Sequence, residues 1–198
     1  MVKNLLIKGN NKLGPNVYLF NLPPVKTCTP TSWCLEGRNG KPSCYALRGY
    51  YTFLNVSDRL DNRLEITKSK DFVEMMSDEI NRKKVVFFRF HVSGDFYSEK
   101  YVLKVKEIAQ NCPNTLFRTT TRRRDLADVV KELNAVPNFI VRESLDWERQ
   151  IPVLGLPFAA LRTLPIIKKT SAYACLDNCE KCDYYCWQYR VNMHFPER

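Results

Sequence analysis

The chain alternates between short apolar runs and segments in which apolar residues recur at helical spacing. Runs rich in aromatic and β-branched residues predict strands at 17–20, 85–92, 115–120, 138–142 and 156–162. Apolar stripes predict helices that begin after Ser69, Ser98 and Asp125, three residues that can cap a helix. Strands and helices that alternate at these intervals indicate βαβ units and a parallel sheet.

The length and composition place these elements in one α/β domain that spans residues 1–198. No spacer-like stretch divides the chain, and 198 residues are too few for a full eight-unit (β/α) barrel of the usual size. A partial (β/α) barrel or a small open sheet remains, and we predict the partial barrel of parallel strands over residues 1–168. It carries a cysteine-rich N-terminal loop, and residues 169–198 are predicted to form a cysteine-rich, metal-binding segment.

The segment from His91 to Ser98 follows an aromatic-rich predicted strand and precedes a helix. Its turn, Ser93-Gly94-Asp95, therefore lies at the carboxyl end of a strand, where α/β proteins bind their ligands. Strand alternation places Arg89, His91 and Ser93 on one face of the sheet. Because a strand buried on both faces normally reads apolar throughout, these polar residues indicate a polar cavity.

Arginines recur near the carboxyl ends of the predicted strands, at Arg89, Arg118, Arg142 and Arg162. In a parallel barrel that end is the working face, and converging guanidinium groups suit a carboxylate or phosphate. We expect the catalytic site of an enzyme with an anionic substrate to be lined by Arg89, His91, Arg118 and Arg142. The alternative is that each arginine pairs with a nearby acid or reaches out to water.

The formal net charge is +10 and the sequence pI is about 9.2, which favours anionic partners such as nucleic acid, nucleotides or phosphorylated metabolites. The arginines at 122–124 and the aromatic residues at 184–189 fit contacts with nucleic acid, or else a solvated helix start and packing around a metal site. No apolar run is long enough for a transmembrane helix and no signal peptide opens the chain. We therefore expect a cytoplasmic protein without membrane contacts.

Eight cysteines are many for an intracellular chain, where they are more often metal ligands or redox groups than disulfides. Cys112 stands alone, and we expect it to be a structural thiol. A C-terminal group consists of Cys175, Cys179, Cys182 and Cys186. Their spacing also describes one stripe of a helix, but on a continuous helix the outer sulfurs would lie roughly 16 Å apart. A shared zinc or iron–sulfur site therefore requires this segment to wrap as a loop, which we predict.

The N-terminal group has three members, Cys28, Cys34 and Cys44, which follow the first predicted strand. Three thiolates on a four-iron cluster leave one iron free to bind a substrate or cofactor. The division of seven cysteines into three and four therefore suggests one reactive cluster and one closed cluster. Zinc is the alternative, with a fourth ligand from His91, His194 or a C-terminal cysteine.

These motifs resemble those of the phage "gene product 88" family, small virus- and plasmid-borne proteins of poorly defined activity, which would place the chain in a host cytoplasm. The similarity rests on the N-terminal cysteines with Cys44-Tyr45-Ala46, on His91-x-Ser93-Gly94-Asp95-Phe96, and on the terminal cysteines closing on Cys186-Trp187. The layout is also similar to radical S-adenosylmethionine enzymes. That resemblance implies a 4Fe–4S cluster on Cys28, Cys34 and Cys44, with S-adenosylmethionine chelating its open iron. It also implies that Ser93, Gly94 and Asp95 bind the methionine amino group.

Three functions are consistent with these patterns. The first is an iron–sulfur enzyme similar to the radical S-adenosylmethionine class, acting on an anionic substrate such as a nucleotide or nucleic acid, with an auxiliary C-terminal cluster. The second is a nucleic-acid-binding module with structural zinc or iron–sulfur sites, and the third is simple electron carriage by the clusters. We favour the enzyme, because electron carriage leaves the polar carboxyl edge of the sheet without a role.

Overall fold

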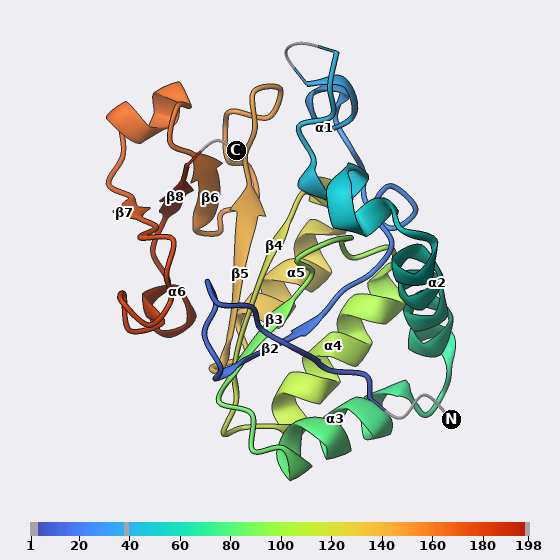
Figure 1. Ribbon diagram of the computed structural model, residues 1–198. Coiled ribbons are helices and arrows are strands. Elements are labelled where there is room, and N and C mark those ends of the chain that lie inside the picture. The colour runs from blue at the N-terminus through green and yellow to red at the C-terminus, as the bar shows by residue number, and fades with distance from the viewer. Residues whose placement is uncertain (1–3, 38–39, 197–198) are drawn as a thin grey trace.

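The computed structural model describes residues 4–37 and 40–196, so the first and last residues of the predicted domain lie outside it. Its centre is one eight-stranded sheet with the order β1-β2-β3-β4-β5-β6-β8-β7 (Figure 1). The strands are β1 (Ile7–Lys8), β2 (Val17–Phe20), β3 (Phe87–Phe90), β4 (Leu116–Thr121), β5 (Phe139–Ser144), β6 (Phe158–Leu161), β7 (Tyr173–Ala174) and β8 (Met193–Phe195). β1 pairs antiparallel to β2, and all the other pairs are parallel. The parallel α/β class is therefore confirmed, and the sheet is open, with no barrel closure.

Four longer helices connect β2, β3, β4 and β5 in chain order and pack against one another in sequence. They are α2 (Leu54–Lys68), α3 (Phe72–Arg82), α4 (Glu99–Asn111) and α5 (Ala127–Asn134). Neighbouring parallel strands follow one another in the chain, so right-handed crossovers place α3, α4 and α5 on the same face of the sheet (Figure 1). The core on this face is rich in aromatic rings, contributed by Phe20, Phe72, Phe88, Phe90, Phe117 and Phe139.

The C-terminal segment covers part of the opposite face of the sheet. It contains β7, the short helix α6 (Tyr185–Gln188) and β8. Val17 and Leu19 of β2 pack there against Cys186 and Trp187, and the Trp187 indole N–H donates to the carbonyl oxygen of Phe88 at 3.0 Å. This segment therefore forms a second core on the face that the long helices leave open.

The remaining short helices lie in the connections. They are α1 (Ser32–Glu36) and the 3₁₀ turns η1 (Tyr45–Leu47), η2 (Gly49–Thr52), η3 (Arg124–Leu126) and η4 (Pro165–Lys168). Figure 1 shows α1 beyond the carboxyl ends of the central strands, at the end of the sheet where a parallel α/β fold presents its loops. No described helix is both long and apolar enough to cross a membrane.

Ser98 caps its helix as expected, whereas Ser69 and Asp125 do not. The Ser98 hydroxyl accepts from the N–H of Tyr101 at 3.3 Å. Ser69 instead ends α2, and α3 begins without a side-chain cap. Asp125 forms an ion pair with Arg123 and lies in η3, before α5. Both expectations were wrong. The backbone N–H of Ser69 bonds to the Ile66 carbonyl at the end of α2, and the Asp125 carboxylate pairs with Arg123.

Candidate functional site

The Ser93-Gly94-Asp95 turn fastens the loop at 22–27 to the carboxyl end of β3. Leu22 donates its N–H to the carbonyl oxygen of Ser93 at 3.0 Å, and the Ser93 hydroxyl donates back to the Leu22 carbonyl at 2.9 Å. The N–H of Asp95 donates to the Thr27 hydroxyl at 3.2 Å. Gly94 has a φ of +79°, and a Cβ atom there would lie 2.7 Å from Leu22 Cβ and from Thr27 Oγ1. Only glycine allows Leu22 and Thr27 to come this close, and the turn thereby fixes the start of the loop that carries Cys28.

Asp95 is buried, and backbone N–H groups hold its carboxylate. Oδ2 accepts from the N–H of Arg122 at 2.8 Å, and Oδ1 accepts from the N–H of Phe96 at 2.7 Å. Burial raises the pKa of Asp95, and these hydrogen bonds offset part of that rise. Asp95 therefore ties the end of β4 to the turn that carries the Cys28 loop.

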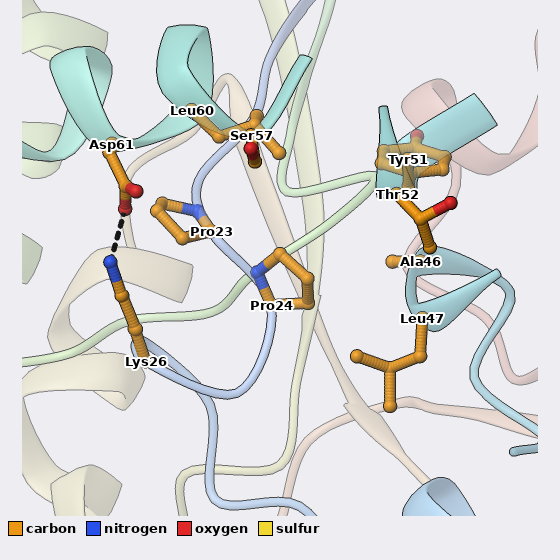
Figure 2. Close-up of a pocket in the computed structure, with 10 residues that line it drawn as sticks. All are labelled: Pro23, Pro24, Lys26, Ala46, Leu47, Tyr51, Thr52, Ser57, Leu60 and Asp61. Atoms are coloured by element: carbon orange, nitrogen blue, oxygen red, sulfur yellow. Dashed lines mark hydrogen bonds and ion pairs between the residues drawn. The ribbon is translucent and has the colours of Figure 1, made fainter. Parts of the chain in front are cut away.

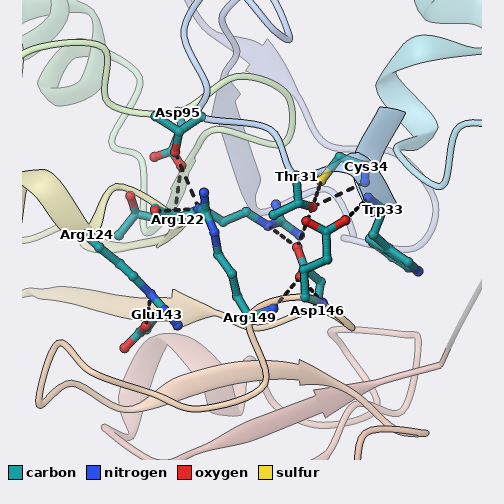
Figure 3. Close-up of polar contacts among 12 residues, drawn as sticks. Thr31, Trp33, Cys34, Asp95, Arg122, Arg124, Glu143, Asp146 and Arg149 are labelled. Atoms are coloured by element: carbon teal, nitrogen blue, oxygen red, sulfur yellow. Dashed lines mark hydrogen bonds and ion pairs between the residues drawn. The ribbon is translucent and has the colours of Figure 1, made fainter. Parts of the chain in front are cut away.

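Arg122 directly follows the carboxyl end of β4, and its guanidinium group extends toward α1 (Figure 3). Its Nε donates to Asp146 Oδ2 at 3.1 Å. The Thr31 hydroxyl lies 3.0 Å from the same oxygen and 3.3 Å from Cys34 Sγ, so its single proton serves one of the two at a time. Burial lowers the pKa of Arg122, but the negative charges of Cys34, Asp146 and Asp95 outweigh it and leave that pKa raised.

Cys28, Cys34 and Cys44 gather around Arg122. The N–H of Cys44 donates to the Cys34 carbonyl at 3.1 Å, which joins the two sides of the loop. Burial, followed by the charge of Asp95, raises the pKa of Cys28 to about 11, and burial also raises the pKa of Cys44. Arg122 acts in the opposite direction on both thiols, which places the cysteines within electrostatic reach of one cation.

The three thiols share this environment without converging on a single point. Within the part of the chain that the structure describes, no group of three or more His, Cys, Asp or Glu side chains is arranged to hold a metal ion. The predicted role of Cys28, Cys34 and Cys44 as ligands of one cluster therefore stays a prediction.

Two buried carboxylates, Glu143 near the end of β5 and Asp146 just after it, close this site from the other side (Figure 3). Asp146 Oδ1 accepts from two backbone N–H groups of the following turn, and Arg149 of that turn donates to the Arg122 carbonyl at 2.9 Å. Glu143 accepts from Arg124 Nε at 2.9 Å and from two further N–H groups of the loop at 2.8 Å. These contacts order the loop between β5 and β6, which has no helix to support it.

The four C-terminal cysteines lie in a segment that wraps, as predicted. Of the four, only Cys186 lies in α6, and the chain reverses at Asp177, Asp183 and Tyr184, whose φ angles are 61°, 46° and 53°. Burial raises the pKa of Cys179 to about 12, and the charges of the other three cysteines contribute in the same direction. All four thiols are therefore within electrostatic reach of one another on the face opposite α3–α5.

Two arginines predicted to line a catalytic site contact this segment instead. Arg142 is buried and donates to three carbonyl oxygens, those of Cys186 at 2.9 Å, Tyr189 at 2.6 Å and Val191 at 2.8 Å. Arg118 Nη1 lies 2.8 Å from Cys186 Sγ, and its guanidinium group lies over Trp187, 4.2 Å from the ring centroid. Both side chains hold the C-terminal segment against the sheet.

His91 lies on the helix-covered face, away from these arginines. β3 ends at Phe90 and His91 has a φ of 59°, so the strand alternation that grouped it with Arg89 stops one residue too early. Its ring nitrogens lie 3.0 Å from the Tyr101 hydroxyl and 3.3 Å from the Thr119 hydroxyl. Burial lowers the pKa of His91 to about 3, so the ring is neutral. The four predicted catalytic residues thus do not meet at one site.

Cys112 and the C-terminal aromatic residues are packed in cores. The Cys112 thiol is buried and lies 3.7 Å from the Ser77 carbonyl, as expected of a structural thiol. Tyr184 and Trp187 pack on Phe87, with ring centroids 4.1 Å and 5.8 Å away. These two rings are therefore not presented to a nucleic acid, whereas Tyr189 is half exposed.

A separate pocket of about 340 Å³ lies between the loop after β2 and α2 (Figure 2). Lys26 and Asp61 form an ion pair of 2.7 Å at its rim. Its lining consists of Pro23, Pro24, Lys26, Ala46, Leu47, Tyr51, Thr52, Ser57, Leu60 and Asp61. None of the predicted site residues lines this pocket.

Sequence reasoning did not assign Thr31, Arg122 and Asp146 to the site. Arg122 was considered only as part of a basic run, although it directly follows a predicted strand. Asp146 follows the next strand in the same way, and two neighbouring strand ends could have indicated the pair. The contact of Thr31 with Asp146 spans 115 residues of sequence and left no local signal.

Comparison with known proteins gives one match. A family model described as gene product 88 matches residues 4–155. No curated protein and no solved structure matches the chain. The matched range contains the N-terminal cysteines, the Ser93-Gly94-Asp95 turn and Arg122, and it stops before the C-terminal cysteines.

Proposed function

The chain belongs to the gene product 88 family, and on that premise we propose that it is an iron–sulfur enzyme whose reactive cluster is bound by Cys28, Cys34 and Cys44. The observation that carries the proposal is the position of Arg122 at the carboxyl edge of a parallel sheet. Arg122 is linked to Cys34 through Asp146 and Thr31, and its charge lies within electrostatic reach of Cys28 and Cys44. That edge is where α/β folds assemble ligand sites.

The donor set fits a three-thiolate cluster in charge and in chemistry. Thiolates are the usual ligands of iron–sulfur clusters, and three of them leave one iron open. Uncompensated, three neighbouring thiolates repel one another, and Arg122 supplies a positive charge within electrostatic reach of all three. Binding requires the thiols to move together, and Cys28 and Cys44 lie in turns outside regular helices or strands.

Residues around the cysteines have defined roles under this proposal. Thr31 donates a hydrogen bond to the Cys34 sulfur and thereby orients it. Asp146 fixes Arg122 and competes for the same Thr31 proton. The Ser93-Gly94-Asp95 turn fixes the start of the Cys28 loop, and the Asp95 carboxylate lies within electrostatic reach of Cys28.

A cluster with an open iron, when bound and reduced, supplies one electron to a sulfonium cofactor such as S-adenosylmethionine. Asp95 is then the acceptor assigned to the amino group of that cofactor, because it is the carboxylate next to Cys28. Arg89 of β3 is assigned to the anionic substrate.

The proposal is tested on protein purified or reconstituted without oxygen, by measuring iron and acid-labile sulfide. We expect about four irons and four sulfides to be lost in Cys28→Ser, Cys34→Ser and Cys44→Ser. Cys112→Ala is the matched control, because Cys112 belongs to neither cysteine group and lies at the end of α4, where its buried thiol contacts the Ser77 carbonyl. Equal iron in the control and the three variants contradicts cluster binding at this site.

The enzymatic part has its own readout. After reduction with dithionite in the presence of S-adenosylmethionine, the wild-type chain is expected to form 5′-deoxyadenosine, and Asp95→Asn to form less with unchanged iron content. A fully loaded protein that forms none contradicts the use of this cofactor and leaves cluster binding to the metal analysis.

A further inference from the structure

An aromatic strip on the surface of the molecule directly follows Cys44. The strip consists of Tyr45 in η1, Tyr50 and Tyr51 in η2, and Phe53 at the N-cap of α2. Tyr50 is 64% exposed and Phe53 is 56% exposed, and the neighbouring Leu54 is 80% exposed. Large apolar side chains that gather on a surface, rather than standing singly, mark a site for a partner.

The rings of the strip pack edge to face, which leaves ring faces open. The ring centroids of Tyr50 and Phe53 lie 5.7 Å apart with an interplanar angle of 64°. Those of Tyr45 and Tyr51 lie 5.9 Å apart with an angle of 60°. In such a pair one ring contributes only its edge, so its face remains available to a further planar group. An open ring face binds a nucleobase of any kind by stacking, because every base has a π face.

Hydrogen bonds hold the strip in place relative to the carboxyl edge of the sheet. The Tyr45 hydroxyl donates to the carbonyl oxygen of Val92, the residue before the Ser93-Gly94-Asp95 turn. Phe53 donates its N–H to the Tyr50 carbonyl at 3.3 Å. The rings are therefore positioned before a partner arrives, which lowers the entropic cost of binding.

Positive charge accompanies the strip on the side of the cysteine loop. Burial and the neighbouring Tyr45 raise the pKa of Tyr51 to about 12, and the charge of Arg89 acts in the opposite direction. Arg89 is therefore within electrostatic reach of the rings, and among the described residues it forms no ion pair with a carboxylate. Arg48, which lies between the rings in the chain, is exposed. Open rings beside cations are the combination with which proteins bind single-stranded nucleic acid, and the chain carries a formal net charge of +10.

The pocket between the loop after β2 and α2 borders the strip. Tyr51 and Thr52 line it on the side of η2, opposite the ion pair of Lys26 and Asp61 (Figure 2). Its volume of about 340 Å³ lies at the lower end of the range for ligand pockets. A base that leaves the stack fits there, where Lys26 supplies donors and Asp61 acceptors for the edge of the base.

We propose that the aromatic strip binds single-stranded nucleic acid, with bases stacked on Tyr50 and Phe53 and a phosphate near Arg89. The inference names the class of the anionic substrate, and it rests on the proposed function for the assignment of Arg89 to that substrate. It concerns residues outside 122–124 and 184–189, the ranges in which the sequence indicated contacts with nucleic acid. Because the strip directly follows Cys44, a bound strand lies beside the N-terminal cysteines.

The test measures the fluorescence anisotropy of a short labelled oligothymidylate on the full chain, with oligouridylate and a DNA duplex as further probes. We expect the single strands to bind more tightly than the duplex, and more weakly as the salt concentration rises. Tyr50→Ala and Phe53→Ala are each expected to weaken binding about ten-fold. Tyr50→Phe and Phe53→Tyr are expected to restore it, because both keep an aromatic ring.

Leu54→Ala is the matched control, because it removes the most exposed apolar side chain of this surface without removing a ring. We expect its affinity to stay within about two-fold of that of the wild-type chain. Circular dichroism checks that each variant is folded. A loss in Leu54→Ala equal to that in Phe53→Ala overturns base stacking. Binding to vesicles of anionic lipid, or dimerisation in sedimentation, in place of oligonucleotide binding overturns the choice of partner.

Arg89 is tested through the salt dependence of binding. In Arg89→Gln the slope of log affinity against log salt concentration is expected to decrease by about 0.7, as for the loss of one phosphate contact. An unchanged slope overturns the role of Arg89.

These measurements need neither a reductant nor S-adenosylmethionine. A chain that binds the oligonucleotide but forms no 5′-deoxyadenosine contradicts the enzymatic proposal and supports this one. A chain that carries iron on the N-terminal cysteines but binds no oligonucleotide contradicts this proposal alone.

Discussion

At the scale of single residues, Gly94 combines a left-handed backbone with a close approach of the chain. A φ of +79° disfavours any side chain, and Leu22 and Thr27 already occupy the space that a Cβ atom would need. The residue therefore does two things at once, since it forms the turn after β3 and admits the loop that leads to Cys28.

We expect Gly94→Ala to lower the free energy of unfolding by about 2–4 kcal/mol, from backbone strain plus displacement of the 22–27 loop. Gly49→Ala is the control, because Gly49 has a φ of +59° with no atom within 4 Å of an added Cβ, and about 1 kcal/mol is expected there. Urea unfolding measures both. Equal losses would show that crowding at Gly94 has no effect.

His91 predicts how stability depends on pH. Its pKa is about 3 in the folded protein and 6.5 in the unfolded chain, so only the unfolded chain binds a proton between these values. The stabilisation is complete above pH 6.5 and is lost as the pH falls toward 3, by at most about 1.4 kcal/mol per pH unit. In His91→Gln the slope of unfolding free energy against pH should decrease over this window. An unchanged slope in urea titrations would contradict the neutral, buried ring.

At the scale of elements, the C-terminal segment is attached mainly through strand arginines. Arg142 donates to three carbonyl oxygens at the end of α6 and beyond it, which helix ends otherwise leave to water. The same segment supplies Trp187 to the second core, and it adds β8 and the edge strand β7 to the sheet. The attachment is thus both polar and apolar.

Arg142→Met is expected to cost about 2–4 kcal/mol of unfolding free energy, because three buried or part-buried carbonyls lose a charged donor. Amide hydrogen exchange should accelerate in residues 185–195 more than in α4. Arg162→Met is the matched control at the end of β6, where the arginine is exposed, and a change within about 0.5 kcal/mol is expected. A similar loss in both variants would argue against a specific role for Arg142.

At the scale of the whole molecule, the two faces of the sheet are covered by different parts of the chain. Helices α3–α5 cover one face, and residues after β6 cover part of the other (Figure 1). β8 pairs in parallel with β6 and extends the sheet, and Met193 of β8 packs in the second core. The C-terminal segment is therefore part of the fold and of its hydrophobic core.

Removal of residues 169–198 should therefore expose Leu19, Phe87 and Leu116, which pack against this segment. We expect the truncated chain to bind a hydrophobic dye such as anilinonaphthalene sulfonate and to lose its cooperative unfolding transition. The full chain is the reference, measured by the same fluorescence and by circular dichroism. A truncated chain with the same transition and no dye binding would mean that residues 1–168 fold independently.

The sequence alone determined the elements whose signal is local. Strand Val17–Phe20, the Ser98 cap of α4 and the apolar stripes of α3 and α5 follow from the period of apolar residues, because that period depends only on near neighbours. The two groups of cysteines and the carboxyl-edge position of Ser93-Gly94-Asp95 were equally visible, since spacing along the chain is enough to identify them.

Tertiary structure alone decided which side chains meet. Arg118 and Arg142 lie within β4 and β5 rather than at the strand ends, and a segment 44 to 68 residues later takes their hydrogen bonds. His91 left the expected face because a single positive φ rotated it, and the two-residue strands β1 and β7 exist only through their partners. Arg122 became the centre of the N-terminal cysteines because Thr31, Asp95 and Asp146 approach it from distant positions. Contacts of this kind are set by the packing of whole elements, and no local pattern in the sequence records them.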